Sequence, residues 1–210
     1  MLSTLRNAWK VPELRKRFLW TIFLVAIFRI GIHIPVPGID TSALSTLTES
    51  GGLLSFYNLI SGGAFTKASI LALSVSPYIN ASIIMQLLTI AIPSLEQLSK
   101  EGEEGRKKIA AATRYLTVGL ALIEAFAIAI GFGRSGYLTQ YNALTVTTVI
   151  MALTAGSAAL MWIGERITEK GIGNGISIVL VINIISRMPN DLASLWKQFI
   201  VGKNVGNATV

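Results

Sequence analysis

The sequence lacks cysteine and holds a single histidine, His33, among its 210 residues. Without cysteine, the chain has no disulfide bond and no thiolate nucleophile. Zinc and other transition metals prefer histidine and cysteine ligands, so a site for them would need carboxylates alone. We therefore expect no catalytic residues, no metal site and no bound cofactor.

Charged residues are also few. They make up 14% of the chain, whereas soluble globular domains carry about 25%. Hydrophobic residues make up 52%, and the mean hydropathy is +0.61. The apolar residues form long runs, and a run of about 20 residues is long enough to cross the hydrocarbon core of a bilayer as a helix. The sequence predicts an all-α integral membrane protein.

Five apolar segments are long enough to predict membrane spans. They cover approximately residues 18–34, 70–92, 115–132, 143–163 and 176–188. Domains follow from these limits: an N-terminal segment 1–17, a transmembrane region 18–190 and a final segment 191–210. Pro12 followed by Glu13 is typical of the first turn of a short helix at the membrane interface.

Basic residues predict the orientation of these spans. The N-terminal segment and the connections 94–114 and 164–175 hold five, five and two Lys or Arg residues, against five on the opposite side. Because the cytoplasmic side carries the excess, we expect the N-terminus in the cytoplasm. Basic residues beside spans also attract anionic lipids. No basic cluster with interleaved aromatic residues predicts a specific nucleic-acid site.

The connection between the first two spans contains a short apolar segment at residues 53–60, followed by Ser61, Gly62 and Gly63. Glycine after an apolar stretch of this length predicts a short helix that ends at the glycines. The segment is too short to cross a bilayer. It either packs into the protein or lies along the membrane interface, and the sequence leaves both possibilities open.

The second span is unusually polar and contains Pro77, Asn80 and Gln86. Pro77 removes a backbone hydrogen bond and predicts a break in the helix. The polar side chains either line a watery path or pack against other helices. Glu124 lies in the middle of the third span and is expected to face the interior of the bundle, paired with Asn80, Gln86 or Arg29.

Two residues near the outer end of the first span have simpler interpretations. We expect Arg29 to extend its guanidinium to the membrane interface. His33 is expected to be an interfacial residue, since no serine is matched to it by a local motif. Residues 171–175 are rich in glycine but lack the Lys and Ser/Thr of a phosphate-binding loop. They predict a tight turn with a helix N-cap, and no nucleotide site.

Four groups of residues stand in a highly specific order and spacing. They are Phe28–Gly31 with Ile34–Gly38, then Ser61–Ala64, then Pro77–Gln86, and finally Glu169–Ser177. This pattern resembles the N-terminal half of the SecY family of protein-conducting channels, over essentially all 210 residues. The connection 94–109 is also typical of bacterial members.

The resemblance implies roles for individual residues. The plug, a short helix that closes the pore from outside, would comprise Ser55, Phe56, Tyr57, Asn58, Leu59, Ile60, Ser61, Gly62, Gly63, Ala64, Phe65, Thr66 and Lys67. A ring of aliphatic side chains at the pore constriction would comprise Val75, Ile79, Leu180 and Ile184. The lateral gate would include Asn80, Ile83, Gln86 and Glu124. Val75 and Leu180 stand where isoleucine is common in the family, but both remain branched and apolar.

The resemblance also implies a fold and a function. Five transmembrane helices would form one half of a ten-helix channel whose halves are inverted repeats. The channel would pass unfolded secretory polypeptides across the bacterial inner membrane and release membrane segments, including signal sequences, through its lateral gate. Its expected partners are the membrane subunits SecE and SecG, with the SecA motor or a translating ribosome at the cytoplasmic face. We expect the second half of the channel to lie outside these 210 residues.

Two alternatives remain open from the residues themselves. A broken helix, a mid-membrane Glu124 and a glycine-rich helix entrance also occur in transporters of small solutes or ions. An intramembrane hydrolase that uses His33 is the second alternative, because catalytic triads depend on geometry that a sequence does not show. Substrate-dependent flux and turnover assays distinguish these from a polypeptide channel.

Overall fold

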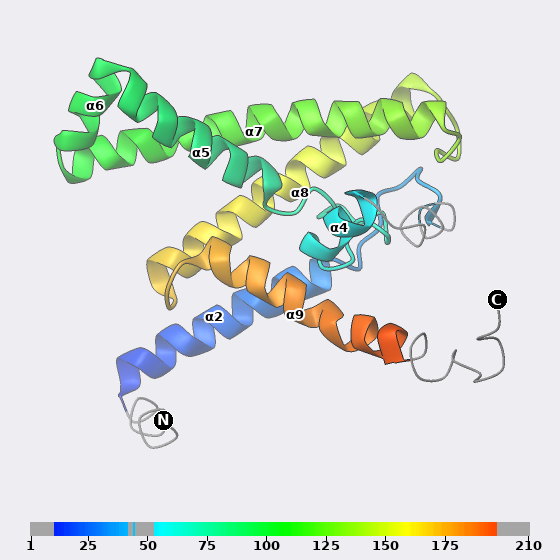
Figure 1. Cartoon of the computed structure of the whole chain (residues 1–210), viewed down its shortest axis with the longest axis horizontal. Helices are drawn as coiled ribbons and strands as arrows, with labels where there is room; N and C mark the ends of the chain where they lie inside the picture. Colours follow the sequence, from blue (N-terminus) through cyan, green and yellow to red (C-terminus); the bar gives the residue numbers. More distant parts are fainter. Residues whose placement is uncertain (1–10, 42–43, 45–52, 197–210) are drawn as a thin grey trace, which may run out of the picture.

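The computed structural model describes residues 11–41, 44 and 53–196, and every regular element in this part of the chain is a helix (Figure 1). The helices are α2 (Pro12–Gly31), α4 (Leu53–Ile60), α5 (Ser76–Ala91), α6 (Pro93–Lys100), α7 (Glu103–Arg134), α8 (Ala143–Lys170) and α9 (Gly175–Trp196). The prediction of an all-α fold is therefore confirmed for the described residues. Most of the predicted segments 1–17 and 191–210 lies outside the described residues or at their edge.

Helix α8 is the centre of the arrangement. It contacts α2, α7 and α9, while α5 packs along α7 and the short α4 packs against α9 (Figure 1). A stripe of small residues spaced four apart on α7, Ala121, Ala125 and Ala129, is fully buried in a cluster with Val149 and Leu153 of α8. Small side chains let helix backbones approach closely, which is how helices associate within membranes.

A second apolar cluster joins the C-terminal half of α8 to its neighbours. Phe28 of α2, Leu160 and Ile167 of α8, and Val179 of α9 are each at most 1% exposed in it. The two clusters lie along different halves of α8, residues 149–153 and residues 160–167, so the first half of this helix packs against α7 and the second half against α2 and α9.

Helices α7 and α8 are each long and apolar enough to cross a membrane, and they contain the predicted spans 115–132 and 143–163. Helices α5 and α6 meet this criterion only together, as one span bent by 101°. The apolar part of α9, Gly175–Pro189, is shorter. Helix length and composition therefore support two or three spans within the described residues, and the number five stays a prediction.

Two predicted helix limits differ from the structure. The span expected at 70–92 is helical only from Ser76, because residues 61–75 form consecutive turns. Pro77 therefore stands in the first turn of α5 and does not break a longer helix. Backbone N–H groups in the first turn have no acceptor within the helix, so a proline there costs no hydrogen bond. The expected short interfacial helix at Pro12 is instead the beginning of the continuous 20-residue α2.

Candidate functional site

Three of the four residues predicted for the pore ring line one cavity. Ile79 of α5 and Leu180 and Ile184 of α9 face a space of about 530 Å³. Its other walls include Leu59 and Ile60 of α4. Helix α4 therefore covers the same apolar space that the ring residues line, which we call the outer cavity.

A second cavity, of about 540 Å³, lies on the side of α5 and α9 that faces the α8–α9 connection. We call it the inner cavity. It has polar walls, among them Gln86, Asn174 and Ser177, together with the ion pair between Arg114 Nε and Glu165 Oε1 at 2.7 Å. Of the described residues, only Ile79 and Leu180 line both cavities. Two aliphatic side chains on different helices thus lie between a space with mixed polar and apolar walls and a mostly apolar one.

Val75 does not line either cavity. It is 1% exposed and lies in the apolar cluster with Phe28 and Leu160. The expectation that Val75 and Ile79 share one helical face required both to be helical. Helix α5 begins at Ser76, so Val75 belongs to the preceding turn and points into the core.

The polar residues predicted for the lateral gate are only partly brought together. Asn80 Nδ2 donates a hydrogen bond of 3.4 Å to Glu124 Oε1, which joins α5 to α7. The expected pairing of Glu124 with Asn80 is therefore present. Gln86 instead donates to Ser82 Oγ at 3.4 Å, one turn away on its own helix. Ile83 is 51% exposed at the wall of the inner cavity.

The predicted plug segment 55–67 is helical over a smaller range. Helix α4 ends at Ile60, and a glycine turn ends it as the sequence predicts, because Gly62 has a φ of +67°. Tyr57 Oη donates a hydrogen bond of 3.1 Å to the Leu73 carbonyl. Burial, and to a smaller extent the Glu124 carboxylate, raises the pKa of Tyr57 to about 12, so the hydroxyl stays protonated at neutral pH.

Aromatic rings fix the same segment to α7, a feature that the sequence analysis missed. Tyr57 and Phe65 meet edge to face with ring centres 5.5 Å apart, and Phe65 meets Phe132 at 5.9 Å. Phe132 in turn meets Tyr137 at 6.0 Å. These residues lie up to 80 positions apart in the chain, so no local pattern indicated the contact.

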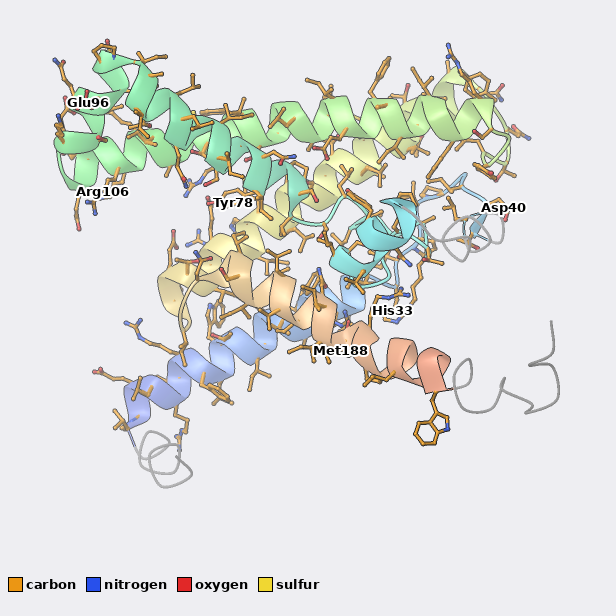
Figure 2. The ribbon with its side chains drawn as sticks, viewed as in Figure 1. His33, Asp40, Tyr78, Glu96, Arg106 and Met188 are labelled. Carbon is orange, nitrogen blue, oxygen red and sulfur yellow. The ribbon has the colours of Figure 1, made fainter. Side chains whose placement is uncertain are left out.

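His33 lies at the end of α2, where Figure 2 shows it beneath α4. Its Nδ1 donates to the Arg29 carbonyl at 3.0 Å, and its Nε2 accepts from Lys67 Nζ at 2.9 Å. The ring therefore links α2 to the chain that follows α4. Arg29 Nη1 is buried without a hydrogen-bond partner among the described residues. Arg29 as a whole is half-buried, so the extension of its guanidinium to the membrane interface stays a prediction.

The glycine-rich connection 171–175 forms the N-cap that the sequence predicts. Asn174 Oδ1 accepts hydrogen bonds from the backbone N–H groups of Ile176 at 3.0 Å and Ser177 at 3.2 Å. The Thr21 hydroxyl of α2 accepts from the Ile172 N–H at 3.2 Å, which holds the turn against the bundle. The cap places α9 so that Leu180 reaches both cavities.

Comparisons with known proteins show which family the chain is similar to. The SecY family model matches residues 69–210. The chain is 44% identical over 213 residues to the protein translocase subunit SecY of Streptomyces scabiei, covering 94% of this chain and 48% of that protein. The chain thus spans about half the length of the curated relatives it matches.

Two solved structures are similar in fold. The first is the channel of a canine ribosome–channel complex from the endoplasmic reticulum, with a TM-score of 0.58 and 20% identity, covering 93% of this chain and 43% of that one. The second is a SecY protein whose plug domain is described as stabilising the closed channel and maintaining a membrane seal. It has a TM-score of 0.58 and 21% identity, covering 92% of this chain and 44% of that one.

Proposed function

The chain belongs to the SecY family, and we propose on this basis that it forms one half of a channel that conducts unfolded polypeptides through a membrane. The observation that carries the proposal is the meeting of the inner and outer cavities at Ile79 and Leu180. A polypeptide passing between the cavities would have to separate these side chains from their counterparts in the other half.

The constriction would seal the channel because it is narrow and apolar. Water leaves such a constriction, and ions then lose their hydration if they enter it. Ile79, Leu180 and Ile184 are the ring residues supported by the cavity geometry. Val75 would join the ring only if the turn before α5 left the apolar cluster in which it is buried.

The plug of this channel would be α4 with the turns that follow it. Leu59 and Ile60 line the outer cavity together with Leu180 and Ile184, which supports a role for α4 in covering the pore. The similar SecY structure carries a plug domain to which a membrane seal is attributed.

The lateral gate would open along the face that carries Asn80 and Glu124. Their hydrogen bond lies at the wall of the outer cavity and is exposed. A polar contact inside a membrane contributes only about 0.6–2 kcal/mol. A signal sequence that enters between the halves could therefore replace it.

The topology we propose has α2, the bent α5–α6 pair, α7, α8 and α9 as five spans, with the N-terminus in the cytoplasm of a bacterial cell. The excess of basic residues in the connections 94–114 and 164–175 supports this orientation. The second half of the channel would repeat these five spans in inverted orientation. SecE and SecG would bind within the membrane, and the SecA motor or a translating ribosome would bind at the cytoplasmic face and supply the energy.

Cross-linking of a stalled secretory chain tests the function. These 210 residues contain no cysteine, so single cysteines can be placed at Ile79, Leu180 or Ile184 in a channel whose second half is also made free of cysteine. Met151 is the control, because it is 61% exposed on α8 and lines neither of these cavities. We expect cross-links to the secretory chain at the three ring positions and none at Met151. Cross-linking at Met151 alone, or flux of a small solute without a polypeptide, would contradict the proposal.

A further inference from the structure

Helix α4 ends in a double glycine turn that lies directly against α9. The Gly62 N–H donates to the Leu59 carbonyl at 3.1 Å, and the Gly63 N–H donates to the Asn58 carbonyl at 2.9 Å. Both glycines have positive φ angles, +67° and +86°. The two hydrogen bonds and the left-handed conformation of the glycines end the helix. They leave its last carbonyl groups close to α9.

Asn183 of α9 touches the first of these glycines. Its side chain is 0% exposed, and Nδ2 donates to Ser74 Oγ at 3.4 Å. A Cβ atom on Gly62 would lie 2.6 Å from Asn183 Oδ1 and 3.2 Å from Asn183 Cα. One Cα hydrogen of Gly62 therefore points at Oδ1, which has no conventional hydrogen-bond partner among the described residues. Such contacts are weak but directional, and they require glycine at this place.

Arg187 touches the second glycine, one helical turn further along α9. Its Nη1 lies 3.0 Å from the position that a Cβ atom on Gly63 would take. The carbonyl end of a helix carries partial negative charge, and a cation placed there stabilises it. Since α4 ends at this point, the Arg187 guanidinium attracts the carbonyl end of α4. Asn183 fits against the glycine turn that follows α4.

We propose that Asn183 and Arg187 are positioning residues that clasp the glycine turn and hold α4 over the outer cavity. The inference rests on the proposed function, because it assigns the closed position of the plug to these two residues. Leu59 and Ile60 share the outer cavity with Leu180 and Ile184 of the same helix α9. Separating the turn from α9 therefore uncovers the constriction, while Phe65 remains anchored to Phe132 of α7.

The spacing between α4 and α9 is the direct test. In the complete channel in lipid vesicles, with any cysteine of the second half replaced by serine, spin labels on cysteines at Leu59 and Met188 report this distance, since these 210 residues contain no other cysteine. We expect Arg187→Gln to raise the population with a longer distance about fivefold, the equivalent of about 1 kcal/mol. Arg187→Lys keeps the positive charge and is expected to retain the native distance.

Glycine substitutions supply a matched pair. Gly62→Ala introduces a Cβ against Asn183, whereas Gly136 has a similar φ of +76° but no atom within 4 Å of its Cβ position. We expect a longer α4–α9 distance for Gly62→Ala and the native distance for Gly136→Ala. Native distances in both Arg187→Gln and Gly62→Ala would overturn the clasp.

Ion leak through the resting channel separates this inference from the proposed function. If the α4–α9 distance lengthens and the ion leak rises about fivefold, the results support both the clasp and the channel function. If the distance lengthens without any leak, the clasp stands but α4 does not close a pore. If signal-dependent translocation proceeds normally and no variant changes the distance, the channel function stands and the clasp is wrong.

Discussion

Asn80 Nδ2 and Glu124 Oε1 lie 3.4 Å apart, and their hydrogen bond joins α5 to α7 at the wall of the outer cavity. The two residues are 44 positions apart in the chain. In the proposed channel this face would carry the lateral gate, so the pair is the place to test gating.

Substitutions of this pair test the gate. We expect Asn80→Leu or Glu124→Ala to increase secretion of substrates with weak signal sequences by about threefold to thirtyfold, the equivalent of a membrane hydrogen bond of about 0.6–2 kcal/mol. The double variant should add little, because both single changes remove the same contact. Secretion assays measure this effect, with Thr147→Val as the control on the exposed face of α8. Unchanged secretion in both single variants would refute the role of the pair.

The apolar constriction yields a second prediction. Ile79→Asn places a polar side chain where the inner and outer cavities meet, so water and ions should enter the resting channel more readily. We expect an ion leak at least about tenfold above the native level. Ile123→Asn is the matched control, since Ile123 is 63% exposed on α7 and lines neither cavity. Equal conductance of the two variants in planar bilayers would exclude Ile79 from the seal.

A third prediction concerns the contact of α8 with the turns before α5. The Cβ atom of Gly156→Ala would collide with the Ile70 carbonyl oxygen and carbon, both backbone atoms. We expect this overpacking to lower the free energy of unfolding by about 1–3 kcal/mol. Gly119→Ala in α7 is the control, because no atom lies within 4 Å of its Cβ position and alanine favours a helix. Denaturation in detergent micelles measures both, and equal stabilities would contradict the close approach.

The N-cap of α9 yields a fourth prediction. Asn174→Ala removes the acceptor for two backbone N–H groups and should lower the free energy of unfolding by about 1 kcal/mol. Asn174→Asp keeps an acceptor at the same place and should retain native stability. Thermal unfolding of the two variants checks the difference. A loss of stability in Asn174→Asp equal to that in Asn174→Ala would show that the amide has another role.

Local patterns were sufficient for several elements. The glycines after residues 53–60 end α4, and Asn174 caps α9, as the sequence indicates. Both features depend on hydrogen bonds and φ angles within a few residues, so neighbours in the chain decide them. The family resemblance also singled out Ile79, Leu180 and Ile184, which line one cavity, whereas aliphatic periodicity alone would not have selected them among so many apolar residues; their place in a pore ring stays a prediction.

Other features were beyond reach of any local pattern. Val75 was predicted to face the pore, but α5 begins one residue later and Val75 is buried in the core. Asn183 was not singled out from the sequence, because its contact with Gly62 joins residues that are 121 positions apart. The start of α5 depends on how the turns at 61–75 pack against α2 and α8, so tertiary contacts decide it.

By itself, the sequence determined that this protein is all-α and apolar enough for a membrane, because composition and hydropathy act residue by residue. It also determined where α4 ends and where α9 is capped, because caps are local. Only the tertiary structure decided which aliphatic side chains meet. Ile79 and Leu180 are 101 positions apart. They come together because α5 packs on α7, α9 packs on α8, and α7 and α8 pack on each other, and no short stretch of the chain contains these long-range contacts.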